Sequence, residues 1–319
     1  ITTGFPCSPR KCLDTRGLYI VSLDVTGSSV DYKFTFTSSS TDPQKHMWIG
    51  VGEAAFLGSD SATDVPPAGR DVRMKLTAIS AIDAKKLAMN KRASDGFDRR
   101  AYTIPSQPRL VVLSGKKKVH EGPMNGGKAT VSLPEGKYTC VVTLPGYNAY
   151  YNPDCRWERG KTYPILSPVL PPGASRVVLQ WASRPRDLDS YMLAPHASPD
   201  ESPCEVSFRK KVCHSGSVHL DKDDVNGHGP ETITIVKFNA GKYVFRVDEY
   251  QGNPEQPSWD ISHAMVTYYA PHLGAVRYEI DRNVGYRDGD VWYVFAIDGS
   301  SRNPEACTPE VCPLRPRPR

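Results

Sequence analysis

The chain lacks the sequence features of several common protein classes. No apolar run approaches the roughly 18 residues that a membrane-spanning helix needs, so we expect no membrane span. The zinc-protease pattern His-Glu-x-x-His and the esterase pattern Gly-x-Ser-x-Gly are both missing, and the eight histidines are scattered. We therefore predict that the protein is not an enzyme.

Zinc-binding cysteine patterns are also missing, although the chain has eight cysteines. An even number of cysteines without Cys-x-x-Cys or Cys/His spacing favours a disulfide framework. Their order suggests four local pairs: Cys7–Cys12, Cys140–Cys155, Cys204–Cys213 and Cys307–Cys312. Because disulfides persist in oxidising compartments, we predict a secreted protein that lies outside the cell or on its surface. No signal peptide is visible, and a chain that begins at Ile1 looks already processed.

The charge pattern gives little support for a nucleic-acid partner. The formal net charge is +5, and the 40 lysines and arginines form no sustained stripe.

No Asn-x-Ser/Thr sequon is present, so N-glycosylation is not expected. Prolines in Ser-Pro, Thr-Pro or Pro-rich settings are candidates for hydroxylation and O-glycans, an interpretation that an intact mass equal to the sequence mass would exclude. These candidates are Pro9, Pro309, Pro313, Pro316 and Pro318.

The apolar pattern predicts an all-β protein built from tandem, Ig-like β-sandwich modules with extended ends. Alternating or β-branched runs predict strands at Leu18–Val25, Val30–Thr37 and Val72–Ile79, which we assign to a first β domain at residues 13–105. A chain of 319 residues is long enough for two or three domains, each with its own core.

Residues 106–172 are predicted to form a second β-sandwich. The strand Arg109–Ser114 is followed by Lys128–Leu133 and by the run LPEGKYTCVVTLPGY, which ends at Tyr147. This run resembles the hallmark of carboxypeptidase-regulatory or Cna-B-like β-sandwiches. The resemblance implies a spacer or stalk module without catalysis.

Residues 173–300 are predicted to form a third β-sandwich. The region contains Trp181, the Asp-Leu-Asp run that starts at Asp187, the run from Leu220 to Thr232, and a closing Val-Trp-Tyr-Val-Phe strand at Val291–Phe295. These motifs resemble the YfaP-type uncharacterised secreted domain. The resemblance implies an all-β sandwich and says little about activity.

Acidic residues concentrate in this third module more than anywhere else. Ca²⁺ takes six to eight oxygen ligands, and closely spaced Asp and Asn with glycines for tight turns are its usual provision. The candidate ligands are Asp187, Asp189, Asp221, Asp223, Asp224, Asn226 and Glu231. The stretch from Asp221 resembles an EF-hand loop but has no glutamate at the twelfth position. The alternative is that Asp187 and Asp189 cap loops and pair with Arg184, Arg186 or Lys222, while the Gly227–Pro230 segment forms a turn.

The two ends of the chain carry matching cysteine motifs. Residues 1–12 and 301–319 have too few apolar residues for a core, and each contains a Cys-(Ser/Thr)-Pro-x-x-Cys ring. The Arg-Pro alternation after Leu314 favours an extended polyproline II segment. Our first hypothesis is a structural subunit of an extracellular fibre or coat, a homopolymer joined head to tail through its ends. Candidate assembly residues are Ile1, Phe5, Leu314, Arg315, Arg317 and Arg319.

The alternative hypothesis is a calcium-dependent adhesion or glycan-binding protein that uses the acidic loops. It predicts a melting temperature that rises with Ca²⁺ and a rise that is lost on Asp221→Ala or Asp223→Ala. A secreted hydrolase is a third reading, and no motif supports it.

Overall fold

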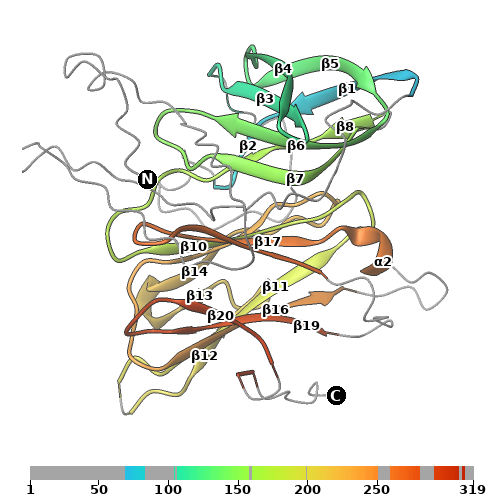
Figure 1. Cartoon of the computed structure of the whole chain (residues 1–319). Helices are drawn as coiled ribbons and strands as arrows, with labels where there is room; N and C mark the ends of the chain where they lie inside the picture. Colours follow the sequence, from blue (N-terminus) through green and yellow to red (C-terminus); the bar gives the residue numbers. More distant parts are fainter. Residues whose placement is uncertain are drawn as a thin grey trace, which may run out of the picture. The chain divides into compact units, whose positions relative to one another are not determined.

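The computed structural model describes residues 69–82, 104, 106–157, 160–198, 200–250, 259–280, 291–308 and 311–312, all within the compact unit Gly50–Arg319. The strands predicted at 18–25 and 30–37 lie outside these residues. The described part is nearly all β and forms two sandwiches (Figure 1). We call β1–β9 the first sandwich and β10–β20 the second. No helix in the described part is long and apolar enough to cross a membrane.

In the sheet of the first sandwich that contains β3, neighbouring strands are antiparallel, and in the other sheet β1 pairs with two strands that are distant in the sequence. One sheet has the order β5-β1-β8, with β1 (Asp71–Thr77), β5 (Lys128–Pro134) and β8 (Gly160–Thr162). The other has the order β4-β3-β6-β7, with β3 (Arg109–Ser114), β4 (Lys117–Pro123), β6 (Gly136–Thr143) and β7 (Tyr150–Trp157). Alternate residues of β3, including Leu110 and Val112, are fully buried, as expected for a strand with one face on a core.

Strand β1 belongs to the predicted first domain but pairs with a strand of the predicted second module. It pairs antiparallel with β5 from Asp71↔Pro134 to Thr77↔Lys128. These strands lie on either side of residue 105, where the sequence places a domain boundary. The 71–77 segment therefore shares a sheet with residues from the predicted second module.

The second sandwich contains the larger core. Its six-stranded sheet has the order β13-β14-β15-β10-β17-β18, with β10 (Ser175–Gln180), β13 (Val212–Cys213), β14 (Val218–Lys222), β15 (Glu231–Ile235), β17 (Met265–Ala270) and β18 (Gly274–Glu279). Its five-stranded sheet has the order β12-β11-β16-β19-β20, with β11 (Leu188–Ala194), β12 (Cys204–Val206), β16 (Lys242–Glu249), β19 (Val291–Asp298) and β20 (Pro304–Ala306). A short 3-10 turn, η2 (His214–Gly216), and a four-residue helix, α2 (Trp259–Ser262), complete it.

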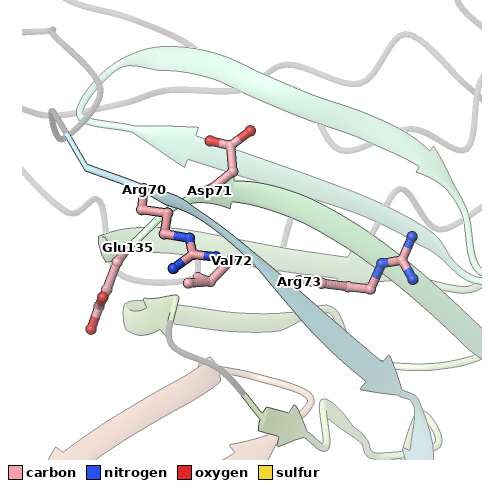
Figure 2. Close-up of a pocket in the computed structure, with 5 residues that line it drawn as sticks. All are labelled: Arg70, Asp71, Val72, Arg73 and Glu135. Carbon is pink, nitrogen blue, oxygen red and sulfur yellow. The ribbon is translucent and has the colours of Figure 1, made fainter.

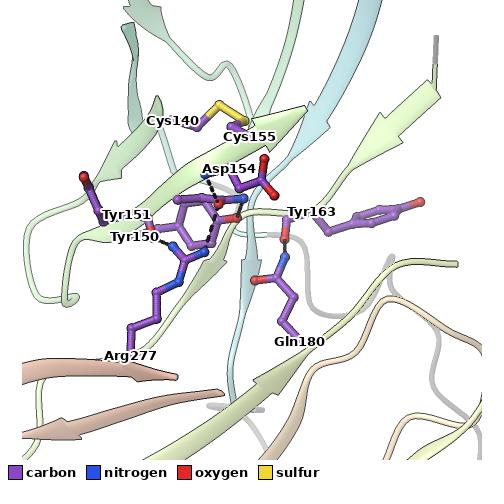
Figure 3. The surroundings of a disulfide bond; sticks show 9 residues. Cys140, Tyr150, Tyr151, Asp154, Cys155, Tyr163, Gln180 and Arg277 are labelled. Atoms are coloured by element: carbon purple, nitrogen blue, oxygen red, sulfur yellow. Dashed lines mark hydrogen bonds between the residues drawn. A yellow bond between two sulfur atoms is a disulfide. The ribbon is translucent and has the colours of Figure 1, made fainter. Parts of the chain in front are cut away.

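A third, smaller core connects the two sandwiches. The parallel strands β2 (Ile79–Ser80) and β9 (Ile165–Leu166) contribute Ile79 and Ile165, which pack in one cluster with Val178 and Tyr269 of the second sandwich. Polar contacts add to this junction, because Arg277 Nη1 donates to Tyr151 O at 3.0 Å (Figure 3). The junction therefore combines a buried apolar cluster with hydrogen bonds.

Three of the four predicted disulfides are confirmed. Cys140–Cys155, Cys204–Cys213 and Cys307–Cys312 are all bonded, and Cys7–Cys12 lies outside the described residues. The first staples β6 to β7 beside the junction (Figure 3), and the second links β12 to β13 and thus the two sheets of the second sandwich. The third closes a ring directly after β20.

Candidate metal centre

Three carboxylates from distant parts of the sequence meet in the second sandwich. Asp189 is the second residue of β11, Asp223 directly follows β14, and Glu231 begins β15. One carboxylate oxygen from each lies within 4.8 Å of the others. The backbone N–H of Ser190 donates to Glu231 Oε2 at 2.5 Å, and this bond ties β15 of one sheet to β11 of the other. The three side chains thus form a group with the dimensions of a cation site, which we call the metal centre.

The carboxylates of the metal centre are buried and only partly hydrogen bonded. Glu231 is 1% exposed, Asp189 3% and Asp223 8%. Glu231 Oε1, Asp189 Oδ2 and Asp223 Oδ1 are buried without a hydrogen-bond partner, and so is Asp187 Oδ1 nearby. Burying an acceptor without a partner costs about 1–3 kcal/mol, and more when it is charged. Three of these four oxygens are on residues of the metal centre, where a bound cation would supply the missing partner.

The pKa values of the carboxyl groups in and beside the metal centre are raised, which also favours a bound cation. Burial, reinforced by the charges of Asp187, Asp223 and Asp248, raises the pKa of Asp189 to about 8. Burial raises the pKa of Asp187 to about 7, with smaller contributions from Asp223 and Asp224. The pKa of Glu231 is also raised well above its usual value, first by burial and then by Asp189 and Asp223. Without a cation these groups resist being ionised together near neutral pH.

Lys211 supplies part of the compensating charge. Its Nζ lies 3.0 Å from Asp223 Oδ2 and leaves Asp223 Oδ1 without a partner. Of the basic residues named in the alternative reading, Arg186 acts on Asp187: burial raises the pKa of that carboxyl, and the Arg186 charge opposes the rise. Arg186 Nε donates to Val225 O at 3.1 Å, and Lys222 Nζ donates to Ser80 O at 3.2 Å. These contacts account for the turn but not for the unpaired carboxylate oxygens.

The loop between β14 and β15 is held in place by its backbone. His228 N donates to Ala182 O at 2.8 Å. Gly227 has φ +79°, and a Cβ there would lie 2.8 Å from Ser183 O. Gly229 is equally confined, because its Cβ would meet Leu179 O at 2.8 Å. Only glycine fits such positions, so both glycines serve the close packing of this loop on the end of β10 and on the segment that follows it.

The structure separates the predicted ligands. Asp189, Asp223 and Glu231 form the metal centre, and Asp187 lies close enough that the effect of burial on its pKa is increased by the charge of Asp223. Asp224 is fully buried and accepts from Asn226 N at 2.9 Å, while the Asn226 residue itself is exposed. Asp221 belongs to a different network, since its Oδ2 accepts from Thr234 Oγ1 at 2.6 Å and its Oδ1 lies 3.2 Å from His219 Nε2.

The sequence did not single out Asp248 as part of this site. It lies opposite Asp189 in the β11–β16 register, and its charge contributes to the raised pKa of Asp189. The sequence feature that could have indicated Asp248 is an acidic pair, Asp248 and Glu249, at the end of an apolar strand. Only the pairing of β16 with β11 shows that this strand end reaches the metal centre.

The remaining predicted sites lie largely outside the described residues. This applies to the assembly residues Ile1, Phe5, Leu314, Arg315, Arg317 and Arg319, and to the O-glycan candidates Pro9, Pro309, Pro313, Pro316 and Pro318. A separate pocket of about 550 Å³ lies at the start of β1 in the first sandwich (Figure 2). It contains none of the predicted site residues, and its lining consists of Arg70, Asp71, Val72, Arg73 and Glu135.

Comparison with known proteins adds little to this geometry. No family model and no curated protein matches the chain. A solved structure of an unknown-function protein, SAV2460, is 17% identical with a TM-score of 0.32, covering 42% of this chain and 86% of that one. A structure from Bacteroides uniformis, provisionally described as carbohydrate binding, is 10% identical with a TM-score of 0.21, covering 66% of this chain and 100% of that one. These scores are too low to support an argument, and the resemblances to YfaP-type and Cna-B-like domains stay predictions.

Proposed function

We propose that the second sandwich binds a Ca²⁺ ion and that the protein is an extracellular, disulfide-stapled calcium-binding protein. The observation that carries the proposal is the set of four buried, unpartnered carboxylate oxygens, three of them on residues whose carboxylates converge within 4.8 Å. A divalent cation would satisfy these oxygens and remove the repulsion among the groups. Asp189, Asp223 and Glu231 are the primary ligands, with Asp187 beside them.

The donor set favours calcium over other common metals. Zinc sites use cysteine and histidine in most cases, and the metal centre offers only carboxylates. Mg²⁺ binds through one or two carboxylates and keeps several waters, whereas Ca²⁺ accepts many protein oxygens in flexible geometry. A buried centre with three or four carboxylates therefore suits Ca²⁺ best.

Calorimetric titration of the EDTA-treated chain with CaCl₂ tests this proposal. We expect one binding site, lost in Asp189→Asn, and much weaker heat with MgCl₂. No binding of CaCl₂ at millimolar concentration would remove the proposal. The glycan ligand of the adhesion hypothesis stays a prediction.

For the fibre hypothesis, the described residues offer only the contacts of the C-terminal cysteine ring. Lys242 Nζ donates to Val311 O at 2.9 Å, Cys307 N donates to Val294 O at 3.1 Å, and Cys312 is 2% exposed. The C-terminal ring is thus packed on its own sandwich and gives the segment from residue 313 a fixed starting point. Because the ring packs on its own sandwich, the hypothesis narrows from residues 301–319 to assembly through residues 1–12 and 313–319.

A further inference from the structure

The β14–β15 hairpin contacts both the metal centre and the first sandwich. Lys222 and Thr232 are register partners, and the next residue on the loop side of each is a metal-centre carboxylate, Asp223 or Glu231. Consecutive side chains of a strand point to opposite faces. The hairpin therefore carries its carboxylates on one face and Lys222 and Thr232 on the other.

Lys222 and Thr232 bind the first sandwich directly. Lys222 Nζ donates to Ser80 O at 3.2 Å, and Thr232 Oγ1 donates to Ala81 O at 2.8 Å. Both side chains are buried, at 2% and 0% exposure. Ala81 is itself fixed to β9, since its N–H donates to Leu166 O at 2.9 Å. These contacts span more than 140 residues of sequence and fasten the hairpin to the junction.

We propose that calcium binding at the metal centre tightens the junction between the two sandwiches. This inference rests on the proposed function. A Ca²⁺ ion held by both Asp223 and Glu231 would bridge the two strands of the hairpin at its loop end, and in its absence that end opens more easily. Lys222 and Thr232 are the adjacent residues, so the same opening withdraws them from Ser80 and Ala81. With Ca²⁺ bound the hairpin end is held, and the contacts to the first sandwich are held with it.

Hydrogen exchange of the full chain, measured by mass spectrometry in EDTA and in CaCl₂, tests the inference. The amides of Ile79 and Ala81 donate to Pro164 O and Leu166 O within the first sandwich and report on the junction. If the junction opens only together with the hairpin, Ca²⁺ at 100 times its Kd slows their exchange by about 100-fold. Strands β3 and β4 belong to a different sheet from the hairpin, so the exchange of their amides should change little.

Two threonine variants separate the junction from the metal centre. Thr232→Val removes the donor to Ala81 and leaves every carboxylate in place. It should bind CaCl₂ like the wild type in calorimetry but lose most of the calcium-dependent slowing at Ile79 and Ala81. Thr234→Val is the matched control, since the Thr234 hydroxyl donates to Asp221 and accepts from Arg176 Nε, both within the second sandwich. It should keep that slowing.

Failure of the inference is distinct from failure of the proposed function. Calcium binding that slows exchange only in residues 188–249 would overturn the coupling and leave the calcium site intact, as would an unchanged response in Thr232→Val. Absence of calcium binding in the wild-type chain would overturn both.

Discussion

At the scale of single residues, the metal centre depends on which way each acidic side chain faces. The sequence predicted seven oxygen ligands as one group, and the structure brings three of them, Asp189, Asp223 and Glu231, into one cluster. Asp221 and Asp223 are two residues apart, yet an irregularity in the β14–β15 pairing falls between Leu220 and Lys222. Asp221 binds Thr234 and His219, whereas Asp223 faces the metal centre. Such a local change in register has no signature in residue spacing.

The two aspartates therefore give a matched pair of variants. We expect Asp223→Asn to weaken Ca²⁺ binding by about 100-fold, or about 2.7 kcal/mol, because it removes a charged ligand from a preformed site. Asp221→Asn should keep the wild-type affinity. Calorimetric titration of both variants checks this, and an equal loss in both would show that the sites were assigned wrongly.

The raised pKa values predict an unusual pH dependence in EDTA. Since the pKa of Asp187 is raised to about 7 and that of Asp189 to about 8, the folded state binds protons that the unfolded state has released above pH 5. Stability from these groups is therefore present at low pH and is lost as pH rises through about 7–8.

We expect the melting temperature in EDTA to fall between pH 5 and pH 8, and the fall to disappear in excess CaCl₂, where the carboxylates bind the ion in ionised form. Thermal unfolding followed by circular dichroism at both pH values measures this. A melting temperature in EDTA that rises over this interval would contradict the burial of these carboxylates.

At the scale of elements, the strands were largely predictable and their partners were not. The prediction of Arg109–Ser114 is confirmed by β3, and that of Lys128–Leu133 is confirmed within β5. Alternation shows which face of a strand is apolar, but it carries no information on which distant strand lies beside it. The pairing of β1 with β5 across residue 105 and the contribution of Asp248 both depend on such long-range contacts.

The loop after β14 gives a prediction at this scale. Gly227→Ala should destabilise the protein by about 1–3 kcal/mol and weaken Ca²⁺ binding, because it combines a positive φ with a backbone clash. Gly146→Ala is the control: Gly146 has φ +83° but no neighbour within 4 Å of the added Cβ. It should cost about 1–2 kcal/mol, the strain of a left-handed residue alone, and leave calcium affinity unchanged.

Urea unfolding and calorimetry of both glycine variants measure these effects. If Gly146→Ala weakened calcium binding as much as Gly227→Ala, the close packing of the loop would not be what shapes the metal centre.

At the scale of the whole molecule, two sandwiches share a buried junction, and the C-terminal ring packs on the second of them. Truncation after Cys312 keeps this ring and β20 while removing the Arg-Pro segment. The fibre hypothesis predicts that this truncated chain keeps its melting temperature but forms no filaments in negative-stain microscopy. Removal of residues 1–12 should have the same result. Filaments that persist in both truncated chains would contradict assembly through the ends.

The most direct test of the central claim is the melting temperature of wild type and Glu231→Gln in EDTA and in CaCl₂. Glutamine keeps the acceptor for Ser190 N and cannot ionise. We predict that Ca²⁺ at 100 times its Kd raises the wild-type melting temperature by about 5–10 °C. In EDTA the Glu231→Gln variant should melt above the wild type, and CaCl₂ should add little to it. A wild type that melts at the same temperature in both conditions, together with a Glu231→Gln variant that melts lower in EDTA, would show that the carboxylates stabilise the fold without a cation.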